Sequence, residues 1–143
     1  EVINYSTEDL RDRIRELTDG VGIDVVYDPV GGDLAESALR SMAWNGRFLV
    51  VGFAAGSIPE IPLNLPLLKG VSIVGVFWGA WTKRDPAGLV TNFAELFAMV
   101  DEGRLNPQVS AAYPLERYVE AFGALTGRQA MGKVILQVAG RQR

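Results

Sequence analysis

The sequence predicts an α/β fold built on a parallel sheet, and two similar segments in its first half carry this prediction. The strand-like runs Ile23–Asp28 and Arg47–Val51 are each followed by a turn of small residues, Pro29–Gly32 and Gly52–Gly56, and the helix-like stretch Asp33–Met42 separates them. A strand, a helix and a strand joined by short loops form a right-handed parallel crossover. Ligands of open parallel sheets bind beyond the carboxyl ends of the strands. The two turns therefore predict a site for a nucleotide-type cofactor.

Composition limits the chemistry that the chain can carry. Its 143 residues suit one domain, and 48% hydrophobic content is enough to bury a core. The net charge of −3, with scattered basic residues, gives no reason to expect nucleic acid or an anionic membrane as a partner. The chain has no cysteine and no histidine, so zinc ligation would depend on carboxylates alone. Any chemistry must come from a cofactor, from carboxylates or from residues outside this chain.

The same features predict a cytoplasmic protein. Absence of cysteine fits a reducing compartment, and the first residues do not resemble a signal peptide. The most apolar stretch, Gly70–Trp81, has 12 residues, whereas a bilayer-spanning helix needs about 20.

The N-terminal segment predicts a short strand and a capped helix. Val2–Tyr5 is apolar and β-prone, and Ser6–Asp9 has the spacing of a capping box. An apolar stripe follows at helical spacing: Leu10, Ile14 and Leu17. The next run, Ile23–Asp28, is nearly all apolar, as expected for a strand covered on both faces.

The middle of the chain predicts further helices, strands and turns. Asp33–Glu36 is a second capping box, and Asn45 with Gly46 predicts a turn into the next strand. Three prolines in Ile58–Leu68 predict an extended segment. Val71–Phe77 is a β-branched run, and Asp85 with Pro86 opens another helix.

The last part of the chain changes character. Val109–Tyr113 and Lys133–Val138 are strand-like, and Leu115–Leu125 between them is helix-like. These pieces are too few to form a core of their own, so we expect them to pack onto something else.

Four segments, in order and spacing, resemble the medium-chain dehydrogenase/reductases, and most closely the zinc-independent NADPH:quinone oxidoreductases, or zeta-crystallin-like group. They are Val2–Tyr5, Val25–Gly32, Gly46–Gly52 and Gly132–Leu136. The resemblance implies that residues 1–105 are the C-terminal part of a Rossmann domain, a doubly wound parallel sheet. It also implies that residues 106–143 belong to a catalytic, GroES-like domain that is otherwise missing.

The glycine-rich phosphate loop of that family does not occur in this sequence. By resemblance, Val2–Tyr5 would be the third strand in the order 3-2-1-4-5-6, and its neighbour, the second strand, is absent. We therefore expect Val2–Tyr5 to be displaced, swapped or paired with another molecule.

The resemblance also implies where a cofactor would lie. Tyr5 would stack near the adenine, although it could instead cover the first helix, and Val30 would contact a ribose. The nicotinamide end would be lined by Val51, Gly52, Phe53 and Ala54, where backbone groups could pair with the carboxamide. Phe77, Trp78 and Gly79, at the end of the sixth strand, would flank the nicotinamide and the substrate opening, or would lie in a subunit interface.

Charged residues add little chemistry. By resemblance Arg128 would lie near the cofactor phosphates, although it could equally be an exposed loop arginine, and Lys133 is expected at an exposed strand edge. Asp28 is expected to fix its turn through backbone hydrogen bonds. Asp24 and Glu36 are interpreted as surface or capping groups, so no residue of the chain is assigned a catalytic or metal-binding role.

The resemblance implies a parent enzyme that transfers hydride from NADPH, with NADH as an alternative, to a quinone or an activated alkene. Two other functions stay open: an enoyl-thioester reductase, and a catalytically silent nucleotide-binding or crystallin-like structural protein. A methyltransferase is disfavoured because the glycine loop and acidic residue that it requires are not seen. The resemblance also implies that the apolar edge strand Ser72–Phe77 pairs across a twofold axis, so we predict a homodimer.

Overall fold

The computed structural model describes residues 1–127 and 129–138. The chain forms two compact units, Glu1–Arg84 and Asp85–Arg143. The expected division into residues 1–105 and 106–143 concerns the domains of the family that the sequence resembles, and it stays a prediction.

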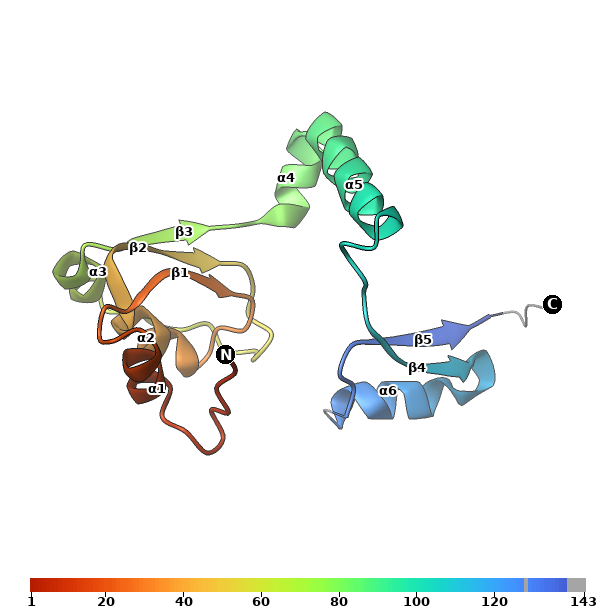
Figure 1. Cartoon of the computed structure of the whole chain (residues 1–143), viewed down its shortest axis with the longest axis horizontal. Helices are drawn as coiled ribbons and strands as arrows, with labels where there is room; N and C mark the ends of the chain where they lie inside the picture. The colour runs from red at the N-terminus through yellow and green to blue at the C-terminus, as the bar shows by residue number, and fades with distance from the viewer. Residues whose placement is uncertain (128, 139–143) are drawn as a thin grey trace. The chain divides into compact units, whose positions relative to one another are not determined.

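The first unit contains a three-stranded parallel sheet in the order β1-β2-β3 (Figure 1). Its strands are β1 (Ile23–Asp28), β2 (Met42–Val50) and β3 (Ser72–Gly75). Asp28 pairs with Val50, and Val50 pairs with Gly75, so the three strands end at one edge. The predicted parallel arrangement is confirmed, as is the edge position of the strand that begins at Ser72. That strand ends at Gly75 rather than at Phe77.

Two helices of this unit lie in segments that the sequence did not predict to be helical. The unit contains α1 (Leu10–Leu17), α2 (Leu34–Arg40), α3 (Asn64–Lys69) and α4 (Trp78–Arg84). Helix α3 lies where an extended segment was expected. Pro66 is tolerated there because it is in the first turn, where amide N–H groups have no intrahelical acceptor. At the start of helix α4, the backbone amides of Ala80 and Trp81 donate to the Phe77 carbonyl, at 3.1 and 3.0 Å.

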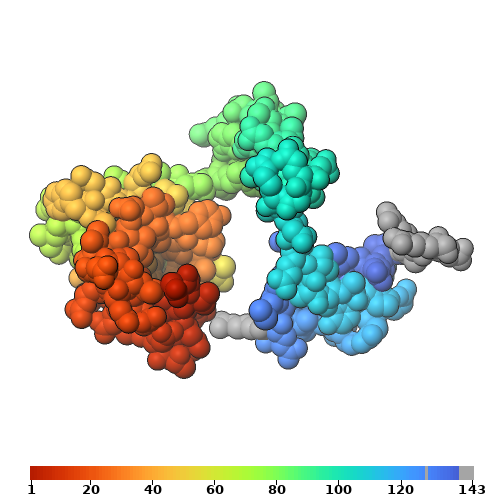
Figure 2. Space-filling model, in the orientation of Figure 1, coloured from red at the N-terminus to blue at the C-terminus, as the bar shows by residue number. Residues whose placement is uncertain are grey.

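The predicted strand Val2–Tyr5 does not form. The Asn4 carbonyl instead accepts from the amides of Thr7 and Glu8, both at 2.9 Å, which makes a turn. The prediction of a capping box starting at Ser6 is also wrong, because the N-cap of α1 is Asp9. The Asp9 carboxylate accepts from the Asp12 amide at 2.9 Å. In Figure 2 this N-terminal segment, in dark red, lies against the orange residues of the first unit.

Two further local predictions were wrong. Asp33 precedes α2 as expected, but its side chain makes no capping hydrogen bond, and Glu36 pairs with Arg40 instead. Asn45 and Gly46 lie inside β2 rather than in a turn before it. Asn45 has a φ of 62°, and the register between β1 and β2 shifts at this point. The two residues therefore make a bulge.

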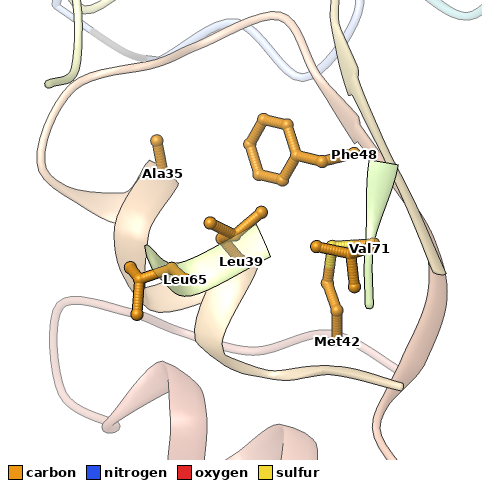
Figure 3. Close-up of a cluster of buried hydrophobic side chains, with 6 residues drawn as sticks. All are labelled: Ala35, Leu39, Met42, Phe48, Leu65 and Val71. Carbon is orange, nitrogen blue, oxygen red and sulfur yellow. The ribbon is translucent and has the colours of Figure 1, made fainter. Parts of the chain in front are cut away.

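A small hydrophobic core lies between α2, α3 and one face of the sheet (Figure 3). Its buried members are Ala35, Leu39, Met42, Phe48, Leu65 and Val71. Val26 packs against this core, but Val25 and Tyr27, its neighbours in β1, are exposed, Tyr27 by 66%. Within this unit the core therefore covers one face of β1, whereas the apolar sequence of the strand predicted two covered faces.

The second unit contains α5 (Pro86–Asp101), β4 (Val109–Pro114), η1 (Leu115–Arg117), α6 (Tyr118–Thr126) and β5 (Lys133–Gln137). Strands β4 and β5 are parallel partners. Asp85 caps α5 by accepting from the Gly88 amide at 2.8 Å, which confirms the predicted helix start. Ala121 is the one buried apolar residue in the described part of this unit, in agreement with the expectation that the pieces from Val109 onward form no core of their own.

No helix in residues 1–127 or 129–138 combines the length and the apolar composition of a membrane span.

Candidate functional site

The turn after β1 is built around the Asp28 side chain. Asp28 Oδ1 accepts from the amides of Val30 and Gly31, at 2.9 and 2.8 Å, which confirms the predicted role of this carboxylate. Gly31 has a φ of +67°, and a Cβ added to it would lie 2.8 Å from Cδ1 of Phe53. The positive φ therefore favours glycine here, and the Phe53 ring would have to shift to admit a Cβ.

The loop after β2 is hydrogen-bonded to this first turn. The amides of Val51 and Gly52 donate to the Asp28 carbonyl at 2.9 and 3.3 Å. Farther along the loop, the amide of Ala54 donates to the Pro29 carbonyl at 3.1 Å, and the amide of Ala55 to the Val30 carbonyl at 3.0 Å. The two turns thus form one hydrogen-bonded unit. Since these N–H groups already have acceptors, a ligand would meet other backbone groups and apolar side chains here.

A hollow of about 410 Å³ opens between the ends of β2 and β3. It is lined by Val50, Val51, Gly52, Phe53, Gly75, Val76 and Phe77. The structure therefore brings together four predicted residues, namely Val51, Gly52, Phe53 and Phe77. Ala54 is exposed in the adjoining loop, and Trp78 and Gly79 lie in the first turn of α4 rather than at a strand end.

A second, smaller hollow of about 180 Å³ is lined by residues of β1, the first turn and α2. Tyr5 and Val30 line it together with Tyr27, Leu34 and other residues of these elements. Tyr5 therefore lies beside the predicted ribose-contacting residue, and its side chain is 59% exposed. Arg128, the residue predicted near the phosphates, lies outside the described residues.

Four basic residues gather around a third hollow that the sequence did not reveal, since these residues are dispersed along the chain. Arg11, Arg15, Arg40 and Lys69 line it, with Asp12 among them. Arg15, Arg40 and Lys69 are in the last turns of α1, α2 and α3, where cations offset the negative ends of the helix dipoles. Lys69 Nζ also donates to the Met42 carbonyl at 3.0 Å. The positions of Arg15, Arg40 and Lys69 are therefore explained by their interactions with the helix ends.

The family described as zinc-binding dehydrogenase matches residues 1–136. The chain belongs to this family. It is accordingly a medium-chain dehydrogenase/reductase sequence, as the resemblance of its four segments predicted.

Three known proteins illustrate the relationship. A quinone oxidoreductase-like protein 2 homolog from Nematostella vectensis is 41% identical over 94% of this chain and 37% of its own length. A 2-haloacrylate reductase from a Burkholderia species is 30% identical over 94% of this chain and 40% of its own length. The solved structure of Escherichia coli quinone oxidoreductase complexed with NADPH has a TM-score of 0.80 and 28% identity, covering 95% of this chain and 42% of that one. The chain thus spans about two fifths of the length of these relatives.

The family description names zinc, for which the described residues offer no recognisable site. The chain has no histidine or cysteine, and its described residues contain no group of three or more acidic residues placed to hold a metal ion. We therefore assign none of its residues to zinc.

Proposed function

We propose that this chain is part of the cofactor-binding domain of an NAD(P)H-dependent oxidoreductase that transfers hydride to a quinone or an activated alkene. The observation that carries the proposal is the apolar hollow at the carboxyl ends of β2 and β3, beside the hydrogen-bonded pair of turns. Its location is where ligands bind in open parallel sheets. Relatives named quinone oxidoreductase and 2-haloacrylate reductase support both acceptor classes.

The residues present fit the flat-ring end of NADPH. A volume of about 410 Å³ lies within the usual range of ligand pockets, about 300–1,000 Å³. The aromatic side chains of Phe53 and Phe77 line this hollow, and aromatic rings stack on flat ligands. The described residues offer no comparable group for the phosphates, so the fit is to part of the cofactor.

NADPH, when bound, supplies the hydride. The chain's own contribution is orientation and exclusion of water. Gly52 lets the loop lie close to the first turn, since an added Cβ would be 3.2 Å from the Pro29 carbonyl oxygen. Phe53 and Phe77 provide apolar surface around the reacting ring. No described residue is placed to act as an acid or a base on the acceptor, so we propose that any such group comes from outside this chain.

An enoyl-thioester reductase is the second candidate, because it would use the same edge of the sheet and reduce the same kind of polarised double bond. A catalytically silent nucleotide-binding protein is the third. We further propose NADPH as the cofactor, with NADH as an alternative, independence from zinc and a cytoplasmic location.

A variant at Gly75 tests cofactor binding in the proposed hollow. Gly75 lines this hollow, and a Cβ added to it would meet nothing within 4 Å, so Gly75→Leu places a side chain in free space. We expect NADPH to bind at least 10-fold more weakly to this variant, because the leucine occupies part of the hollow. Isothermal titration and NADPH-dependent thermal shift would measure the change.

Gly123→Leu is the matched control, since Gly123 in α6 is also unobstructed and lies in the other unit. Equal NADPH affinity of Gly75→Leu and the unaltered chain would contradict the site.

We also expect no turnover of NADPH with a quinone by this chain alone, and clear turnover would refute that expectation.

We propose that β3 pairs with β3 of a second copy to form a homodimer. It is an edge strand, and Ser72–Gly75 carries no charge to oppose pairing. Val74→Lys is expected to shift the mass measured by light scattering from two chains to one. The control Leu67→Lys changes an exposed residue of α3 and should leave the mass unaltered. A single-chain mass for the unaltered protein at micromolar concentration would contradict the dimer.

A further inference from the structure

Asp28 is the point at which the two turns of the site are joined. Its carboxylate oxygen Oδ1 accepts from the amides of Val30 and Gly31, at 2.9 and 2.8 Å. Its main-chain carbonyl accepts from the amides of Val51 and Gly52, at 2.9 and 3.3 Å. One residue thus accepts hydrogen bonds from both segments that follow β1 and β2.

The carboxylate also acts on the second loop without touching it. It holds the Pro29–Gly31 turn, and the carbonyls of Pro29 and Val30 in that turn accept from Ala54 and Ala55. Gly31 lies close to the ring of Phe53, which lines the larger hollow. If the first turn lost its hydrogen bonds to the Asp28 carboxylate, the loop that carries Phe53 would therefore lose its support as well.

The first turn lines one of the two hollows, and the second loop lines the other. Val30 lines the smaller one together with Tyr5, and Phe53 lines the larger one. The spacing between the hollows is set by the turn and the loop, and these are held together by the bonds described above. A ligand with two recognition groups gains affinity only if both groups can be engaged at once.

We propose that Asp28 is a positioning residue for the dinucleotide: its carboxylate fixes the distance between the two hollows, so that one cofactor molecule can occupy both. This inference rests on the proposed function. Asp28 lines the smaller hollow but not the larger one, in which the reacting ring is proposed to lie.

The test compares Asp28→Ala with Asp28→Asn, whose side-chain oxygen can still accept from the two amides. We expect Asp28→Ala to weaken NADPH binding at least 10-fold while changing the affinities of reduced nicotinamide mononucleotide and 2′,5′-ADP less than 3-fold. Asp28→Asn should restore most of the NADPH affinity. Asp24→Ala, which removes an exposed carboxylate from the same strand, is the control and should behave like the unaltered chain.

A purely structural role would weaken the half-ligands as much as NADPH, and that result would overturn the proposal, as would unchanged NADPH affinity in Asp28→Ala. Amide hydrogen exchange provides a readout that needs no ligand. Exchange at Val51, Gly52, Ala54 and Ala55 should accelerate at least 10-fold in Asp28→Ala, and unchanged exchange would overturn the coupling. Failure of the unaltered chain to bind NADPH, with accelerated exchange in the variant, would overturn the proposed function while retaining the coupling of the turns.

Discussion

Replacing Gly22 by alanine is expected to lower the free energy of unfolding of the first unit by about 3 kcal/mol or more. Gly22 immediately precedes β1 and has a φ of +93°. An added Cβ would lie 2.7 Å from the Ser41 carbonyl oxygen and 2.8 Å from the Ala43 amide nitrogen. Both are backbone atoms, which cannot move aside by rotation of a side chain. The strand entry and the beginning of β2 would therefore have to separate.

Gly20→Ala is the matched control for this prediction. Gly20 also has a positive φ, +81°, but a Cβ there would meet nothing within 4 Å. Its substitution should cost only the backbone strain, about 1 kcal/mol. Urea denaturation followed by circular dichroism measures both variants. Equal stability losses would show that the contact around Gly22 has no energetic effect.

The second large effect is expected at Leu39, which is 1% exposed at the centre of the core in Figure 3. Leu39→Ala removes apolar contacts with the residues of this cluster and leaves a cavity between α2 and the sheet. Such substitutions cost about 2–5 kcal/mol. The small core makes compensation by neighbouring residues difficult, so we expect a value in the upper half of this range.

Leu67→Ala removes the same atoms from a side chain that is 78% exposed. It should change the free energy of unfolding by less than about 0.5 kcal/mol. Denaturation of the two leucine variants side by side separates burial from helix propensity, since Leu39 and Leu67 are both helical. A loss at Leu39 no larger than that at Leu67 would contradict the assigned core.

The parallel sheet could be predicted because its strands are short apolar runs separated by turn residues. Ile23–Asp28 and Arg47–Val51 correspond closely to β1 and to the end of β2. The prediction of a strand at Val2–Tyr5 was wrong for a physical reason, because β-prone residues form a strand only beside a partner strand. Helix α3 was missed because the prolines masked a helical first turn that accepts Pro66.

The candidate site was predictable in position but not in its internal bonding. Glycines and Asp28 indicated the turn after β1, and the structure confirms the side-chain bonds of Asp28. The bonds from Val51 and Gly52 to Asp28 connect segments more than 20 residues apart. They depend on the register of β1 against β2, which no local pattern encodes. The basic hollow around Arg11 and Lys69 likewise arises only when residues of α1, α2 and α3 come together in the fold.

The most direct test of the cofactor edge is an NMR titration of the isotope-labelled chain with NADPH, followed residue by residue through the backbone amides. Binding at the carboxyl ends of the strands predicts concentration-dependent shifts at Val30, Gly52, Phe53 and Phe77, with none at Arg11 or Arg40. Shifts concentrated around the basic hollow, or none in the two turns at saturating NADPH, would contradict the account.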